Sequence, residues 1–184
     1  MSQEVTAIIP AYNEATTVTN PISTAISTPS ISHIVIVDDG SIDDTKKTIE
    51  TFLKKTDTAK RIDFISHSNN LGKSAAIASA LNKVSSEATL MLDADIRDLN
   101  PTVVETMIKS YFDQQASLII YYKYEETGTI ERMVDQLLGA EMLLCGERIV
   151  ETKILRELEN LNSLGYALEV TINQYCIDHI KKIV

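Results

Sequence analysis

Two pairs of aspartates each follow an apolar run of the kind that forms a buried strand. Asp38 and Asp39 end "HIVIVDD", and Asp93 and Asp95 end "ATLMLDAD" further along the chain. Two carboxylates separated by one residue can approach a single hard cation, with water and phosphate completing the coordination shell. Mg²⁺ or Mn²⁺ suits such a pair and could neutralise a diphosphate leaving group. The spacing indicates a metal site at Asp93 and Asp95, and the alternative for an isolated Asp-x-Asp is a solvated loop.

Short runs rich in β-branched residues lead to these positions. The predicted strands are "VTAIIPA" (5–11), "HIVIVDD" (33–39), "RIDFISH" (61–67) and "ATLMLDA" (88–94). Each is followed by a polar loop and by helical spacing, over residues 15–26, 44–55, 71–84 and 101–115. Strands that are apolar on both faces and alternate with helices are typical of a parallel sheet covered on both sides. We therefore expect a three-layer α/β fold with a mostly parallel sheet.

The ends of the predicted helices carry local signals. Asp43 or Asp44 can cap the second helix, and Pro101 after Asn100 suits the first turn of the fourth. Pro21 weakens the first helix, which could break or restart there.

Ligands of open α/β sheets bind in the crevice at the carboxyl ends of the strands. Both aspartate pairs stand at such ends, and the turn "PAYNE" (10–14) ends the first strand. We expect these three strand ends to converge on one site.

The second half of the chain has a different pattern. After the predicted strand "SLIIYYKYE" (117–125) the sequence is mostly helical, over residues 130–144 and 152–176, with "GERIV" (146–150) as a short extended candidate. We interpret residues 1–184 as a single domain whose second half adds to the sheet. The final "HIKKIV" is either a further strand or the shortened end of a longer chain.

Composition narrows the class of protein. Lys and Arg total 17 against 26 Asp and Glu, a formal charge of −9, with no dense basic block, so nucleic acid is not an expected partner. No apolar run approaches the roughly 20 residues that span a membrane, and no signal-like leader is visible, so we expect a cytoplasmic protein. Cys145 and Cys176 lack metal-ligand or redox spacing and are expected to be buried free thiols.

Four motifs in this order resemble one known family. "IIPAYNE", "IVDDGSIDDT", "NNLGKSAAIASAL" and "LMLDAD" resemble the nucleotide-sugar glycosyltransferases of the second family, which have the GT-A (Rossmann-like) fold. The resemblance is close over residues 1–100, the implied nucleotide-sugar-binding half. Residues 101–184, the implied helical acceptor-side half, are similar through "CGERIVETKIL" and "LGYALEVTIN" to polyprenyl-phosphate glycosyltransferases and glucosyl-3-phosphoglycerate synthases.

The resemblance implies a divalent-metal-dependent enzyme. Mg²⁺ or Mn²⁺ would assist transfer of a sugar from a UDP- or GDP-linked donor to a small or lipid-phosphate acceptor, with peripheral membrane contact for a lipid. Polysaccharide synthesis is disfavoured, because the tryptophan box of processive members needs a residue type that this chain lacks.

The resemblance also assigns roles to residues of the first two strand ends. It implies a nucleoside pocket made of Pro10, Ala11, Tyr12 and Glu14. Tyr12 would lie beside the base and Glu14 near the ribose. Asp39 would accept a hydrogen bond from the base, while Asp38 would brace the loop formed by Gly40 and Ser41.

Further implied residues act on the diphosphate and the acceptor. Gly72 makes room for a turn, and Lys73 at a helix start would reach the base or diphosphate. Asp93, with its neighbour Ala94, would face the ribose or a metal-bound water. Asp95 would bind metal and diphosphate directly. The implied catalytic residues are Asp95 and Glu169, the latter near the acceptor or metal, although a glutamate on a helix is often only solvated.

Several assignments in the second half stay open. Gly146, Glu147 and Arg148 resemble an acceptor loop or form a simple turn. Tyr121, Tyr122 and Tyr124 could line the acceptor side or occupy strand faces, and His67 could approach the site.

Two alternative functions remain at this level. One is a sugar-phosphate nucleotidyltransferase, although the glycine-rich basic loop of that class is missing. The other is a non-catalytic nucleotide-sugar-binding module. The apolar helices expected after Ile130 could pack on the sheet or on a second subunit, and we favour a homodimer.

Overall fold

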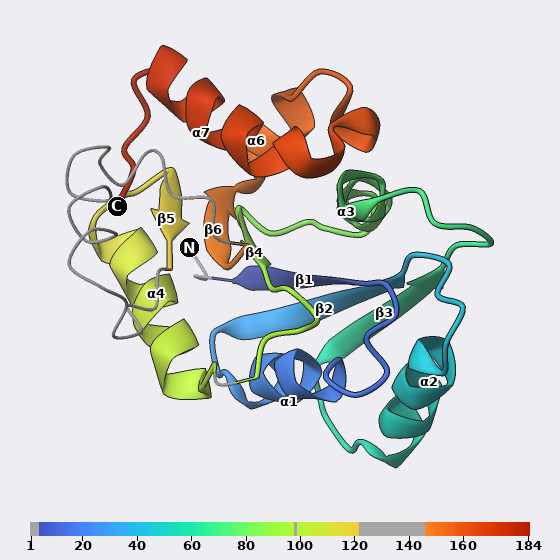
Figure 1. Ribbon diagram of the computed structural model, residues 1–184. Coiled ribbons are helices and arrows are strands. Elements are labelled where there is room, and N and C mark those ends of the chain that lie inside the picture. Colours follow the sequence, from blue (N-terminus) through green and yellow to red (C-terminus); the bar gives the residue numbers. More distant parts are fainter. Residues whose placement is uncertain (1–3, 98, 122–145) are drawn as a thin grey trace, which may run out of the picture.

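A six-stranded sheet forms the centre of the computed structural model, which describes residues 4–97, 99–121 and 146–184 (Figure 1). The strands are β1 (Val5–Ala11), β2 (Ile31–Asp38), β3 (Arg61–Ser66), β4 (Ala88–Met91), β5 (Leu118–Ile120) and β6 (Arg148–Glu151). Their order is β3-β2-β1-β4-β6-β5, and β1 to β4 pair in parallel. β6 is antiparallel to both of its neighbours, so β5 runs in the same direction as β1 to β4. The expected mostly parallel sheet is confirmed.

Helices cover both faces of this sheet (Figure 1). One face carries α1 (Thr19–Ser27), α2 (Thr45–Lys55) and α4 (Pro101–Asp113), and the other carries α3 (Lys73–Leu81), α6 (Thr152–Glu157) and α7 (Leu168–Asp178). The side chains of β1 alternate between the two layers: Ala7 and Ile9 pack with α1, and Ile8 packs with α3. The predicted three-layer fold is therefore confirmed.

The central strand explains why the sheet is stable. All seven residues of β1 are buried, because helices lie over both of its faces. Fully burying an isoleucine such as Ile8 or Ile9 contributes about 1.5–3 kcal/mol. The strand that leads to the "PAYNE" turn is thus held firmly in place.

The start of the first helix differs from the prediction, whereas the starts of the second and fourth helices carry the expected signals. The first helix begins at Thr19, after turns at residues 15–18, so Pro21 falls in its first turn, where no helical partner for an N–H is needed. The Asn100 side chain caps α4 by accepting the N–H of Thr102 at 2.7 Å. Asp44 is the N-cap residue of α2 without a capping hydrogen bond from its side chain, but Asp43 accepts the N–H of Thr45, the first residue of the helix, at 2.9 Å.

The second half completes the sheet. The predicted 152–176 helical region consists of α6 and α7, separated by short 3₁₀ turns at Leu161–Ser163 and Gly165–Ala167. The C-terminal residues lie along β5, where Val184 donates its N–H to Leu118 and accepts that of Ile120. The helix expected at 130–144, Cys145, Tyr122 and Tyr124 lie outside the described residues.

Cys176 is a free, buried thiol, and burial raises its pKa to about 11. Among the described residues, no helix combines the length and the apolar character that a membrane crossing requires.

Candidate functional site

A cleft of about 700 Å³ opens at the carboxyl ends of β1, β2 and β4, beside the first turns of α3 and α7. Its lining consists of Pro10, Ala11, Tyr12, Glu14, Asp39, Asn70, Gly72, Lys73, Asp93, Ala94, Asp95, Gly146, Gly165 and Glu169. All the site residues predicted from the sequence belong to this set except Asp38. The three strand ends therefore meet around one cavity.

The loops after β1 and β2 are tied to each other. Asn13 takes the left-handed conformation, with φ of 57°, which asparagine tolerates better than most residues. Its N–H donates to Ser41 Oγ at 3.0 Å, and its Oδ1 accepts the N–H of Ile42 at 2.9 Å. The N–H of Glu14 donates to Thr45 Oγ1 at 2.7 Å. These reciprocal bonds fix the floor of the cleft before any ligand binds.

Tyr12 and Glu14 stand on this floor. Tyr12 is 40% exposed and lines the cleft. The carboxylate of Glu14 accepts a hydrogen bond from Thr17 Oγ1 at 2.6 Å, which holds it at the cleft wall.

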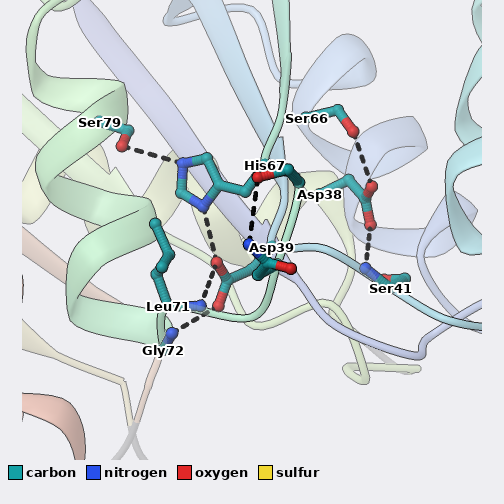
Figure 2. A network of polar contacts seen from close by, with 10 residues as sticks. Asp38, Asp39, Ser41, Ser66, His67, Leu71, Gly72 and Ser79 are labelled. Atoms are coloured by element: carbon teal, nitrogen blue, oxygen red, sulfur yellow. Dashed lines mark hydrogen bonds and ion pairs between the residues drawn. The ribbon is translucent and has the colours of Figure 1, made fainter.

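Asp38, grouped with the donor-binding residues as the expected brace of the Gly40–Ser41 loop, does not line the cleft itself. Its carboxylate is buried and accepts the N–H of Ser41 at 3.2 Å and the hydroxyl of Ser66 at 3.0 Å (Figure 2). The adjacent Gly40 has φ of 69°, and a Cβ there would lie 2.2 Å from the carbonyl carbon of Asn69. Asp38 and Gly40 therefore fix the conformation of the loop without lining the cleft.

Asp39 points the other way and joins three segments. It is 3% exposed, and its N–H donates to the carbonyl of Ala11 at 2.8 Å. Its carboxylate accepts the N–H groups of Leu71 and Gly72 at 3.0 and 2.7 Å and contacts His67 Nδ1 at 2.7 Å (Figure 2). His67, which sequence reasoning left as a residue that could approach the site, therefore contacts a cleft residue directly.

Lys73 links three elements across the cleft. It is the first residue of α3, and its Nζ lies 2.6 Å from Asp93 Oδ1 and 2.8 Å from Glu169 Oε1. Burial alone would lower the pKa of Lys73, but the two carboxylates outweigh this effect and raise it. Glu169 lies in the first turn of α7. Its side chain is largely buried, so it is not simply a solvated glutamate on the helix surface.

The other side of Asp93 rests on Gly146, just before β6. A Cβ at Gly146 would lie 1.8 Å from Asp93 Oδ2, so only glycine leaves space for this carboxylate. Burial, the charge of Asp93 and that of Asp95 raise the pKa of Glu147. Sequence reasoning grouped Gly146 and Glu147 only as loop residues, because no local signal shows that they lie against Asp93.

Arg148 belongs to the framework of β6. It is fully buried, and its guanidinium donates to Asn173 Oδ1 at 2.9 Å. Tyr121 is half-buried and donates its N–H to the carbonyl of Glu147 at 2.9 Å. Neither side chain is part of the cleft lining.

Asp95 lies at the cleft wall with its side chain exposed. Within the described part of the chain it has no hydrogen-bond or ion-pair partner, and no three His, Cys, Asp or Glu side chains are gathered as a metal cluster. Asp95 therefore offers an open carboxylate to the cleft, two residues along the chain from Asp93.

Comparisons with known proteins agree with this arrangement. The model of the family "Glycosyl transferase family 2" matches residues 6–167. CsbB of Bacillus subtilis (strain 168), described as a glycosyltransferase, is 34% identical over 112 residues, which cover 58% of this chain and 32% of CsbB. The succinoglycan biosynthesis protein ExoU of Rhizobium meliloti (strain 1021) is 24% identical over 163 residues, which cover 89% of this chain and 47% of ExoU. The chain thus spans less than half the length of either relative.

Solved structures show the same fold. The mannosyltransferase PcManGT of Pyrobaculum calidifontis, in complex with GDP-Man and Mn²⁺, matches with a TM-score of 0.81 at 17% identity, over 98% of this chain and 54% of that one. Glucosyl-3-phosphoglycerate synthase of Mycobacterium tuberculosis, in complex with UDP, matches with a TM-score of 0.73 at 20% identity, over 96% of this chain and 66% of that one. With a family model that extends from β1 to the start of α7, this chain belongs to glycosyl transferase family 2.

Proposed function

We propose that this chain binds a nucleoside diphosphate sugar in the cleft and transfers the sugar to an acceptor, assisted by a divalent cation. The observation that carries the proposal is the meeting of the β1, β2 and β4 ends with Lys73 and Glu169 around one cavity. Family membership and the ligands named for the two solved structures support it. The proposed donor is a UDP- or GDP-linked sugar.

The charge of the cleft favours a metal-dependent mode of binding. Among the described lining residues Lys73 is the single cation, and it already pairs with two carboxylates. The lining carboxylates are those of Glu14, Asp39, Asp93, Asp95 and Glu169. A diphosphate would be repelled by this acidic field unless a cation entered with it.

The donor atoms present fit such a cation. Asp95 offers exposed carboxylate oxygens, and Asp93 could supply a second contact directly or through water. Mg²⁺ and Mn²⁺ take oxygen ligands and bind commonly through one or two carboxylates plus substrate phosphates, so a preformed three-residue cluster is not required. When bound, the cation would supply charge neutralisation for the departing diphosphate.

The protein side chains would position the donor. Tyr12 would pack against the base, Asp39 would accept a hydrogen bond from it, and Glu14 would face the ribose. The N-terminal end of α3, with Lys73, would attract the phosphates. Each of these residues lines the cleft. The backbone of Glu14 is held by Thr45, and the carboxylate of Asp39 is held by the N–H groups of Leu71 and Gly72.

Glu169 is the candidate catalytic carboxylate on the acceptor side. Its ion pair with Lys73 at 2.8 Å holds the carboxylate at the cleft wall, where it could accept a proton from an acceptor hydroxyl. The acceptor would be a small molecule or a lipid phosphate, the latter reached by peripheral contact with a membrane.

Ligand-dependent melting and donor turnover test the proposal. The protein is melted with UDP, GDP, CDP, ADP and the corresponding nucleotide sugars, each with and without Mn²⁺, and donor hydrolysis is followed with and without acceptors. A ligand at 100 times its Kd should raise the free energy of unfolding by about 2.7 kcal/mol, which corresponds to a melting shift of roughly 5–10 °C.

Asp95→Asn should abolish the Mn²⁺-dependent shift and the turnover, while the exposed Asp57→Asn at the opposite end of the sheet should change neither. Donor binding without turnover over a broad acceptor panel would instead indicate a binding module. Pyrophosphate release from a nucleoside triphosphate and a sugar phosphate would indicate a nucleotidyltransferase. No binding of any nucleotide would refute the proposal.

A further inference from the structure

A buried chain of polar contacts runs from the cleft into α3. Ser79 Oγ lies 3.0 Å from His67 Nε2, and His67 Nδ1 lies 2.7 Å from Asp39 Oδ1 (Figure 2). The side chains of His67 and Asp39 are only 11% and 4% exposed. The order serine, histidine and aspartate also occurs in hydrolases, but here Asp39 lines the cleft and Ser79 does not. Of these three side chains, the Asp39 carboxylate is therefore the one that can contact a ligand in the cleft.

The contacts of Asp39 occupy most of the hydrogen-bond acceptor positions of its carboxylate. An ionised carboxylate offers about four acceptor positions. His67 and the N–H of Leu71 use Oδ1, and the N–H of Gly72 uses Oδ2. One position, on Oδ2, is left for a donor in the cleft.

We propose that His67, held by Ser79, is a positioning residue for base recognition: it fixes Asp39 so that a single acceptor position faces the base. This inference rests on the proposed function. A lone acceptor favours uracil and guanine, which carry a ring N–H on the edge that pairs in nucleic acids. Cytosine and adenine offer an amino group on that edge, but their ring nitrogen beside it is an acceptor, which a carboxylate placed opposite the ring nitrogen repels. His67 thus sharpens base selectivity without touching the nucleotide.

The same carboxylate connects the base to the phosphate end of the cleft. Asp39 holds the N–H groups of Leu71 and Gly72, and Lys73 follows immediately as the first residue of α3. Gly72 has φ of 92°, so the turn depends on this glycine and on the carboxylate that binds its N–H. If Asp39 rotated, both base selection and the approach of Lys73 would suffer.

The chain contains a matched control for the loss of a buried histidine–aspartate pair. His33 is 6% exposed, and its Nε2 lies 2.8 Å from Asp63 Oδ2. It lies near the amino end of β2, roughly 16 Å along the strand from Asp38. His33→Leu therefore reports the general cost of such a loss without disturbing the cleft.

The test measures Kd values of UDP, GDP, CDP and ADP with Mn²⁺ by calorimetry for wild type, His67→Leu, His67→Asn, Ser79→Ala and His33→Leu. Wild type should prefer UDP over CDP or GDP over ADP. His67→Leu should reduce that preference at least about tenfold, the lower end of the range expected for one hydrogen bond to a charged group. His67→Asn places an amide near the former Nδ1 and should keep the preference within about threefold. Ser79→Ala should give an intermediate loss.

An unchanged base preference in His67→Leu would overturn the inference while leaving the proposed function standing. An equal loss of preference in His33→Leu would also overturn it, because the effect would then be general destabilisation. If wild type bound no nucleotide, the proposed function itself would fail. Should His67→Leu not fold, His67→Asn is compared with His67→Gln, whose amide replaces Nε2 instead: a preference kept by Asn and lost by Gln supports the inference, and the reverse contradicts it.

Discussion

One added methyl group at Gly146 should displace Asp93 and leave the backbone undisturbed. A Cβ at this position would lie 1.8 Å from Oδ2 and 2.4 Å from Cγ of Asp93. Gly146 has no left-handed φ, so alanine is compatible with its backbone and the conflict is confined to the carboxylate. Because ordinary contacts begin at 3.4 Å, the carboxylate must retreat by roughly 1.5 Å.

This retreat breaks the ion pair between Asp93 and Lys73, whose atoms are 2.6 Å apart. Both side chains are about 30% exposed, so screening reduces the loss to about 1–2 kcal/mol. Replacing glycine by alanine stabilises the protein by about 0.4–1 kcal/mol, because it reduces the conformational entropy of the unfolded chain. The net loss is therefore at most about 1.6 kcal/mol, and the melting temperature should fall by no more than about 6 °C. Donor turnover should fall about 100-fold, because misplacement by an ångström has that effect on catalysis.

A double-mutant cycle with Asp93→Ala checks this reasoning. Turnover and Mn²⁺-dependent nucleotide affinity are measured for Gly146→Ala, for Asp93→Ala and for the double variant. If the methyl group acts by displacing the carboxylate, the double variant should be no worse than Asp93→Ala alone. Strictly additive losses, or full activity in Gly146→Ala, would refute the assigned contact.

Three further predictions concern the framework. Gly40→Ala should lower the free energy of unfolding by more than about 2 kcal/mol in denaturant titrations, because it combines a φ of 69° with a backbone clash. In a Cys145→Ser background, Cys176 should react with iodoacetamide at pH 8 only after unfolding, since burial raises its pKa to about 11. Burial alone would raise the pKa of Asp63, but its histidine and arginine partners lower it. The ionised Asp63 should stabilise the folded protein fully above pH 3.8, its ordinary pKa, and this contribution should disappear as the pH falls through its lower pKa in the folded state. The free energy of unfolding of an Asp63→Asn variant should therefore equal that of wild type in strong acid.

Local patterns in the sequence were sufficient for the first half of the fold. The apolar run at 5–11 coincides with β1, and Asn100 followed by Pro101 marks the start of α4. Each of these signals lies within a few residues of the feature that it predicts, since strand alternation and helix caps are local properties. The strand-end position of Asp39, Asp93 and Asp95 followed from the same patterns.

Contacts between distant segments could not be predicted in this way. The sequence placed Glu169 early in a helix but gave no sign that its carboxylate meets Lys73, 96 positions away. Nothing local indicates that Gly146 supports Asp93, or that His67 binds Asp39 and Ser79. The local pattern of "VDDG" does not distinguish its two aspartates. Their separate roles were expected only from the family resemblance, and the fold shows Asp38 against the loop and Asp39 in the cleft.

The insertion of β6 between β4 and β5 has a consequence for biosynthesis. During translation, β4 and β5 leave the ribosome before β6, so the hydrogen-bonding edge of β4 lacks its partner until residues 148–151 have been made. An unpaired apolar strand edge invites association with other chains. Nascent chains that stall after β5 should therefore depend on chaperones, and fragments that end before residue 148 should collect in inclusion bodies.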